Sequence, residues 1–367
     1  MMSGSGRLLG LEAGRFAAAL LVACFHFSIM FVDFHEVYVF DMAFRAGHAG
    51  VEYFFVLSGF IIYYIHRSDL GVRAKLRDFA VKRAIRLYPM YLAVFAALLA
   101  AFALIPSLGG DRDLSPGSLV LDALLLPMNG SEVLAQSWSL RHEVVFYAIF
   151  SIAILNARAG VAALVAWQLG SLVFGLLYPS DVAGAVKPFL YLHNIGFGMG
   201  IFAAWASFRW QPRRPGLIAL AGLTLFIAAM VIEWKIGRYV PVPGRPLGER
   251  VSPIIYLSCS ALIIFGVTQM EKVRALPFGS LLKVLGGASY ALYLVHTAVG
   301  SVLIRVFQAD VFRFLSYEGQ FVLMVLVAIC ISVVAHLAVE KPLLAFLRSK
   351  LLKRSNRRVV TAVAGVA

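Results

Sequence analysis

The chain has 367 residues, of which 61% are hydrophobic and 14% are charged, with a mean hydropathy of +0.84 and a formal net charge of +14. A soluble domain is about half apolar and about a quarter charged, so this composition excludes an ordinary soluble enzyme, a disordered chain and a charged nucleic-acid-binding domain. It predicts an all-α integral membrane protein with several spans.

A membrane-spanning helix needs about 20 apolar residues. Ten segments meet this requirement, at about 9–32, 47–66, 84–106, 138–155, 160–178, 186–206, 215–234, 252–270, 285–304 and 319–340. The longest connection runs from Pro106 to Ser137 and contains turn signals such as Gly109-Gly110. We therefore expect one membrane domain over residues 1–345 and a basic cytoplasmic tail over residues 346–367.

The basic residues indicate which side of the membrane each connection faces. With ten spans, 22 of the 33 Lys and Arg residues fall on the side that holds both termini, and ten fall on the other side. Cytoplasmic connections of membrane proteins carry an excess of Lys and Arg. The distribution therefore predicts that both termini are cytoplasmic, and the even number of spans agrees with termini on one side.

Basic residues are densest between the second and third expected spans. Residues 72–87 have apolar side chains at helical spacing among the bases, which predicts a helix on the cytoplasmic membrane surface. This stretch contains Lys82, Arg83 and Arg86, and the two arginines lie three residues apart on one helix face. Two guanidinium groups at that spacing can bind phosphate, which would belong either to membrane lipid or to a phosphorylated cofactor.

Ionisable residues inside the spans are functional candidates because they are costly to bury in lipid. Arg15 and His26 lie 11 residues apart in the first span. This spacing is close to three helical turns, so both fall on one face, about 16 Å apart. Glu52 in the second span is expected at a similar depth, where its carboxylate would orient the imidazole. The alternatives are a histidine that only bonds another helix and a carboxylate that reaches interfacial water. Deeper in the second span, Ser58-Gly59 is expected to allow close helix packing.

The fourth span opens with a polar and aromatic segment. Trp138 and Ser139 precede three ionisable residues, 141–143, and Glu143 shares a helix face with Tyr147. Ionisable residues that run directly into apolar sequence favour a water-filled cavity. The alternative is a solvated helix entry in which Trp138 is an interface anchor.

Small and polar residues are grouped again in the ninth span. Ser289, Tyr293 and His296 follow helical spacing, and Gly286-Gly287 would let another helix or a substrate approach closely. The alternative is polar contact between helices. His193-Asn194 in the sixth span is a further candidate of the same kind. The eight histidines show no spacing with Cys or carboxylates that predicts a metal site.

Together these motifs resemble the acyltransferase 3 family of integral membrane acyltransferases. The matched elements are Arg15 and His26 with ten residues between them, GVEYFFVLSGF at 50–60, KRAIRLYP at 82–89, SWSLRHEVVFY at 137–147, GGASYALYLVH at 286–296 and Glu340-Lys341-Pro342. The resemblance covers about Leu9 to Pro342. It implies ten spans with cytoplasmic ends, and acylation of bacterial glycans such as O-antigen or exopolysaccharide, or of small molecules.

The resemblance also implies roles for the candidate residues. The donor would be a cytoplasmic acyl-CoA, with acetyl-CoA as the first expectation, bound through its phosphates by Arg83 and Arg86 with Lys82. His26 would be the essential histidine and would either deprotonate the acceptor hydroxyl or accept the acyl group. The other expected catalytic residues are Glu52, Glu143 and Arg15, and Arg15 would also help to bind the donor. The expected acceptor-binding residues are Trp138, Ser139, Tyr147, Tyr293 and His296.

The expected acceptor is a glycan or lipid-linked saccharide on the periplasmic side of a bacterial inner membrane, and membrane lipid surrounds the chain. Nucleic acid is not an expected partner, no metal is expected, and the oligomeric state stays open. Two alternatives remain. The first is an acyltransferase for a small-molecule acceptor. The second is a transporter or flippase, for which intramembrane Arg, His and Glu would suit proton coupling. The sequence lacks the half-to-half similarity and paired broken helices typical of such carriers.

Overall fold

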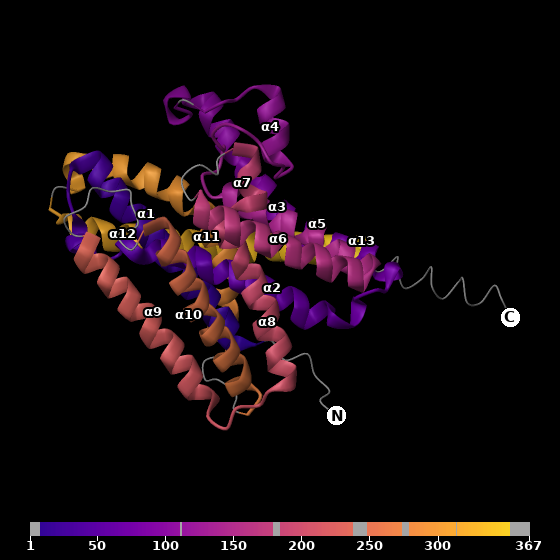
Figure 1. The fold of residues 1–367 in the computed structure, drawn as a ribbon. Helices are drawn as coiled ribbons and strands as arrows, with labels where there is room; N and C mark the ends of the chain where they lie inside the picture. The colour runs from indigo at the N-terminus through magenta and orange to yellow at the C-terminus, as the bar shows by residue number, and fades with distance from the viewer. Residues whose placement is uncertain are drawn as a thin grey trace. The chain divides into compact units, whose positions relative to one another are not determined.

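The regular elements of the protein are helices. The computed structural model describes residues 8–110, 112–178, 184–237, 248–273, 279–312 and 314–352, and every regular element within these ranges is helical (Figure 1). Ten segments there are long and apolar enough to cross a membrane. The predicted all-α fold with ten spans is therefore confirmed. Helices suit this environment because they satisfy their own backbone hydrogen bonds in lipid.

The long helices follow the apolar runs of the sequence. They are α1 (Leu9–His35), α2 (Gly50–His66), α3 (Leu76–Leu104), α5 (Ser137–Leu155), α6 (Ala157–Leu177), α8 (Ile195–Arg209), α9 (Pro215–Gly237), α10 (Gly248–Glu271), α11 (Gly279–Val306) and α12 (Tyr317–Ala335). The shorter helices are α4 (Pro116–Ala123), α7 (Lys187–Leu190) and α13 (Lys341–Leu351).

The basic stretch before the third span differs from its expected form. Residues 76–87 are the first turns of α3, and the helix continues through Pro89 to Leu104. Phe79 and Ile85 are buried in this part of α3. The basic stretch is therefore continuous with the span, and part of its apolar face packs inside the protein.

Two other spans contain irregular turns. The sixth is interrupted where α7 ends at Leu190, because Tyr191 is extended and the short 3-10 helix η7 (Leu192–Asn194) precedes α8. Next to this interruption the Asn194 amide donates to Ser171 Oγ at 3.1 Å. The last span ends in a π turn, η9 (His336–Glu340), before α13. Such irregularities often mark functional positions.

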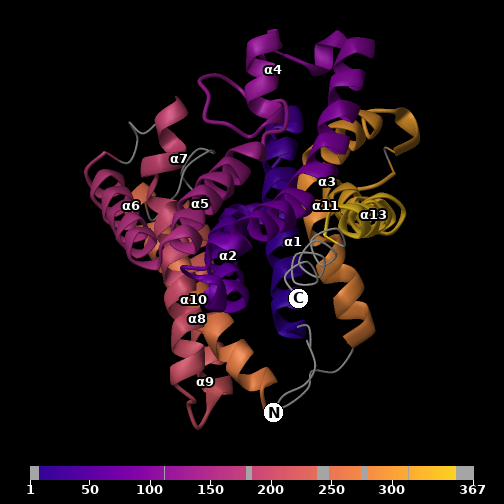
Figure 2. The same cartoon turned by 90° about the vertical axis from the view of Figure 1, so that its right-hand side faces the viewer.

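The helices form two compact units. The first unit comprises Met1–Ile65, Gln168–Ala183 and Leu190–Val333, and the second comprises His66–Trp167, Gly184–Phe189 and Val334–Ala367. In the first unit α1 packs against α11, and α9 packs against α10 (Figures 1 and 2). In the second unit α3 packs against α5 and α13. Of the expected tail over 346–367, the structure describes residues up to 352, and α13 crosses the expected boundary.

Glycines allow the close contact between α1 and α11. A Cβ atom at Gly286 would collide with Glu12, and one at Gly300 would collide with Phe27. The order of these pairs shows that the two helices run in the same direction, as ten alternating spans require of the first and ninth. The predicted close approach at Gly286-Gly287 is confirmed for Gly286.

A second pair of glycines sits where α2 and α8 cross. A Cβ atom at Gly59 would meet the backbone of Phe197, and one at Gly200 would meet the backbone of Val56. The expected packing role of Ser58-Gly59 is therefore confirmed for Gly59, because the backbones touch there and leave no space for a side chain.

This crossing leads to a stability prediction with a matched control. Gly200→Ala forces an overlap with backbone atoms and should destabilise the protein by about 1–3 kcal/mol. At Gly170 of α6 a Cβ atom would make only an ordinary contact with Leu190, so Gly170→Ala should be neutral or stabilising by up to about 1 kcal/mol. Melting temperatures of the detergent-purified variants test this, and equal values would contradict it.

Candidate active site

Two histidines from distant parts of the sequence meet in the first unit. His26 Nδ1 of α1 lies 2.9 Å from the Val22 carbonyl oxygen and 3.1 Å from His296 Nε2 of α11. His296 is fully buried, and its Nδ1 lies 3.0 Å from the Leu292 carbonyl oxygen. The rings of Tyr293 and His296 have centroids 6.2 Å apart. The structure thus brings together three candidate residues, and the two histidines are 270 positions apart.

The histidine pair adjoins an apolar core. The Phe27 ring lies 6.3 Å from the His296 ring, measured between centroids. This core also includes Phe31, Leu292, Phe321 and Met324. Hydrogen bonds in such a low-dielectric environment are electrostatically stronger than in water. Contacts between the two imidazoles therefore have a strong influence on where their protons lie.

Arg15 lies toward the N-terminal end of the same helix. Its Nη1 donates to Glu12 Oε2 at 3.3 Å, and both side chains are partly exposed. Because α1 is unbroken from Arg15 to His26, the two residues keep the predicted separation of about 16 Å on one helix face. At the same end of α1, the Gly10 backbone N–H donates to the Glu271 carboxylate of α10.

Glu52 belongs to a second buried network in the first unit. Its Oε1 lies 3.2 Å from His193 Nε2 and 3.9 Å from His48 Nδ1. His48 Nε2 lies 3.2 Å from Glu233 Oε2, which also accepts from the Tyr256 hydroxyl at 2.9 Å. Both carboxylates are fully buried. Two histidines and a tyrosine thus compensate two carboxylates that would otherwise be costly to bury.

The Phe25 ring contacts both this network and His26. The Phe25 ring lies 5.1 Å from the His26 ring and 5.6 Å from the His48 ring, between centroids. The structure therefore places His296, in place of the expected Glu52 carboxylate, within hydrogen-bonding distance of His26. Sequence reasoning did not single out His48 or Glu233. The available signal was the four-residue spacing of His48 and Glu52, which places both on one helix face.

In the second unit, Arg86 is held by a residue of the π turn. Arg86 Nη1 donates to Glu340 Oε1 at 2.6 Å, and His336 Nδ1 lies 2.7 Å from Glu340 Oε2. Glu340 is buried, whereas Arg86 is partly exposed. The Glu340-Lys341-Pro342 element therefore supplies a carboxylate to one arginine of the Arg83–Arg86 pair. The π turn brings the side chains of His336 and Glu340 into contact.

Arg83 is held by a different partner. Its Nη2 lies 3.4 Å from His66 Nε2, and its guanidinium carbon lies 5.9 Å from the centroid of the Phe79 ring. His66 Nδ1 lies 2.8 Å from Asp69 Oδ2, so the imidazole donates to Asp69 and accepts from Arg83. Lys82, the third expected phosphate-binding residue, is exposed.

The remaining predicted residues of the fourth span also lie in the second unit. The Tyr147 hydroxyl donates to the Glu143 carboxylate. The ammonium group of Lys187 lies 5.3 Å from the centroid of the Trp138 ring, and the Ser139 hydroxyl donates to the Gln136 carbonyl at 3.1 Å. Their expected proximity to His26 stays a prediction.

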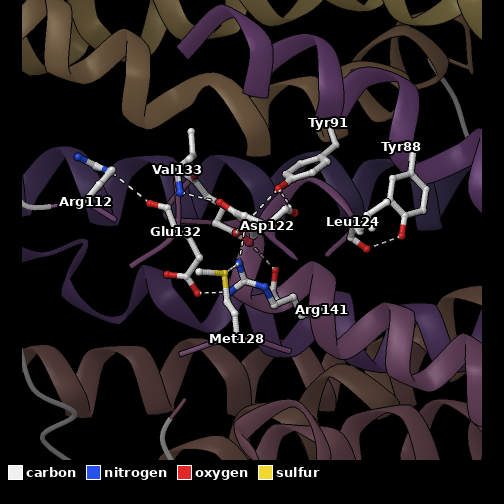
Figure 3. Close-up of polar contacts among 12 residues, drawn as sticks. Tyr88, Tyr91, Arg112, Asp122, Leu124, Met128, Glu132, Val133 and Arg141 are labelled. Atoms are coloured by element: carbon white, nitrogen blue, oxygen red, sulfur yellow. Dashed lines mark hydrogen bonds and ion pairs between the residues drawn. The ribbon is translucent and has the colours of Figure 1, made fainter. Parts of the chain in front are cut away.

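Arg141, one of the three consecutive ionisable residues at the start of the fourth span, forms a buried ion-pair cluster (Figure 3). Its Nη2 lies 2.5 Å from Asp122 Oδ1, and its Nη1 lies 2.5 Å from Glu132 Oε1. Asp122 also accepts from the Val133 backbone N–H at 2.7 Å and from the Tyr91 hydroxyl at 3.2 Å. The cluster joins α3, α4 and α5 and fixes the connection between the third and fourth spans. Sequence reasoning missed it because its members are far apart along the chain.

Removing Asp122 should destabilise the protein strongly. Asp122→Ala leaves the buried Arg141 with one fewer counter-charge and the Val133 N–H without its acceptor, which should cost about 3–5 kcal/mol. Asp113→Ala is the matched control, because this carboxylate of the same connection is exposed and accepts only local hydrogen bonds from Ser115 and Ser118, so its removal should cost much less. Thermal unfolding of the purified variants measures the difference. Equal melting temperatures would contradict the structural role of the cluster.

The fold and site define a multi-pass membrane protein whose buried ionisable residues gather into a few networks. The sequence matches the family model described as an acyltransferase domain over residues 8–337. The chain therefore belongs to the acyltransferase 3 family, as its motifs predicted, and is a membrane acyltransferase. It is 31% identical over 344 residues to the "Exopolysaccharide production protein ExoZ" of Rhizobium meliloti (strain 1021), covering 88% of this chain and 96% of that protein. No solved structure matches it.

Proposed function

We propose that the protein transfers an acyl group, acetyl in the first instance, from acyl-CoA to a hydroxyl group of a bacterial exopolysaccharide or its lipid-linked precursor. The observation that carries this proposal is the His26–His296 contact beside an apolar core, in a chain that belongs to a membrane acyltransferase family. The name of its relative, which refers to exopolysaccharide production, supports a glycan acceptor.

We also propose that the protein lies in a bacterial inner membrane and that both of its termini are in the cytoplasm. The 22 basic residues on the side of the termini support it. The parallel course of α1 and α11 supports alternating spans. In this orientation Arg83 and Arg86 lie near the cytoplasmic end of α3, where they would bind the phosphates of acyl-CoA. The acceptor would reach His26 from the periplasmic side.

In the proposed reaction, the acceptor hydroxyl oxygen attacks the thioester carbonyl carbon. The new C–O bond forms, the C–S bond breaks, and CoA leaves as the thiolate. His26 takes the hydroxyl proton as general base and returns it to the thiolate, so the products are an ester and CoA thiol. Arg15 would guide the donor along the face of α1 that leads to His26. Transfer of the acyl group to His26 itself is the covalent variant of this scheme, and trapping an acyl-histidine would identify it.

The test uses membranes that contain the protein and radiolabelled acetyl-CoA. The expected result is release of CoA together with label in the polysaccharide fraction, and loss of O-acetyl signals from the NMR spectrum of the polysaccharide in a deletion strain. Label in a small soluble product would favour a small-molecule acceptor. Movement of a substrate across proteoliposomes without acyl transfer would instead favour a transporter and overturn the proposal.

A further inference from the structure

We infer that His296 is the positioning residue of His26. It accepts a hydrogen bond from Nδ1–H of His26 and thereby leaves Nε2 of His26 as the atom that exchanges the proton with substrate. The inference rests on the proposed function, because it assigns a particular atom to the proposed general base. It also gives His296 a role different from the acceptor contact expected from the sequence.

The proton position on His296 follows from its backbone partner. His296 Nδ1 lies 3.0 Å from the Leu292 carbonyl oxygen, which can only accept a hydrogen bond. Nδ1 therefore carries the proton, and in a neutral imidazole Nε2 then presents a lone pair. A doubly protonated His296 would place an unpaired charge in a fully buried site and would aim Nε2–H at the second histidine.

The proton position on His26 follows in the same way. His26 Nδ1 faces two acceptors, the Val22 carbonyl oxygen at 2.9 Å and His296 Nε2 at 3.1 Å. A proton on Nδ1 satisfies both contacts. A lone pair on Nδ1 would instead bring three lone pairs together. The neutral His26 therefore carries its proton on Nδ1 and its lone pair on Nε2.

Helix packing holds the two rings in this relation. Each imidazole bonds the carbonyl four residues earlier in its own helix, which fixes the ring against the backbone. Gly300, one helical turn beyond His296, touches Phe27 and so lets α11 approach α1 at the level of the rings. The orientation of His26 thus depends on both helices.

This arrangement suits a base that is neutral at rest. When Nε2 of His26 takes the hydroxyl proton, the imidazolium keeps its Nδ1–H bonds to Val22 and His296, and bonds from a charged donor are stronger than neutral ones. The proton then passes from Nε2 to the CoA thiolate, and His26 returns to its first state. Tyr293 on α11 is an ionisable neighbour of the pair, and His48 lies beyond Phe25.

Three substitutions at position 296 test the inference. Glutamine can place an amide oxygen near the position of imidazole Nε2, whereas asparagine has the same amide on a shorter side chain and leucine has no acceptor. We expect H296L and H296N to lower kcat for acetyl transfer from acetyl-CoA at least about 100-fold, with KM for acetyl-CoA unchanged within about twofold. H296Q should stay within about tenfold of the wild-type kcat, because it preserves the acceptor. Gel-filtration elution of the detergent-solubilised variants checks that each one is folded.

The outcomes separate this inference from the proposed function. Wild-type kcat in H296L, or equal losses in folded H296Q and H296N, would overturn the positioning role. If H296L does not fold, the comparison of the two amide variants decides. Full activity of H296L beside an inactive His26→Ala variant would overturn only this inference. Activity in His26→Ala would instead refute the general-base assignment under the proposed function.

Discussion

Replacing His26 by alanine should lower the rate of acyl transfer about 1,000-fold or more. General acid–base catalysis contributes about 100- to 10,000-fold, and in the proposed scheme His26 both removes the hydroxyl proton and protonates the leaving thiolate. The binding of acyl-CoA should change little, because the residues proposed to bind its phosphates are on a different helix. CoA release and labelling of the polysaccharide fraction, in membranes with matched amounts of protein, measure the effect.

The chain offers a control on the same helix. His35 closes α1, and its ring contacts the Tyr317 ring with centroids 5.2 Å apart. His35→Ala removes an imidazole from the same helix without touching the histidine pair, so it should keep most of the activity. Wild-type transfer in His26→Ala would refute the assignment. An equal loss in both variants would show that α1 had been disturbed as a whole.

Replacing Arg83 or Arg86 by alanine should raise KM for acetyl-CoA by about 10- to 100-fold each. A hydrogen bond to a charged group contributes about 1.5–3 kcal/mol, and every 1.4 kcal/mol is about tenfold in affinity. The kcat at saturating donor should change much less, because the arginines would bind the phosphates and not the reacting atoms. Initial rates over a range of acetyl-CoA concentrations separate the two parameters.

Two controls show whether these arginines act on phosphate. Arg77→Ala removes an exposed arginine of the same helix, and its KM should stay near wild type. S-acetyl-N-acetylcysteamine is a thioester donor without phosphates, so the arginine variants and the wild type should use it equally well. An increase in KM for both donors would show that the arginines support the fold and would contradict phosphate binding.

The sequence predicted most of the fold because the membrane imposes a simple rule on it. Apolar runs of about 20 residues form helices in lipid, and the ten expected spans are present. The departures occur where tertiary contacts override the local pattern. The basic turns before the third span join α3 because Phe79 and Ile85 are buried. No local signal predicted the π turn at 336–340, whose Glu340 bonds a residue on α3.

The sequence could identify individual candidate residues of the site, but not which of them contact one another. The spacing of Arg15 and His26 placed both on one helix face, and α1 confirms that they share an uninterrupted helix. The partner of His26 is His296, and no periodicity within either helix relates two residues in spans so far apart. The same limit explains why His48 and Glu233 were missed, since their contact depends on the packing of α9 beside η2 (Arg45–Ala49).

The ion-pair cluster around Arg141 has a consequence for chimeras between relatives. Acceptor preference could be tested with chimeras in which the connection between the third and fourth spans is exchanged between relatives. Here that connection carries Asp122 and Glu132, which are the two counter-charges of a buried arginine on α5. A donor segment without both carboxylates would leave Arg141 charged in an apolar setting, which is strongly destabilising. The connection should therefore be exchanged together with the start of α5. A chimera that separates the two would measure the loss of folding and not the choice of acceptor.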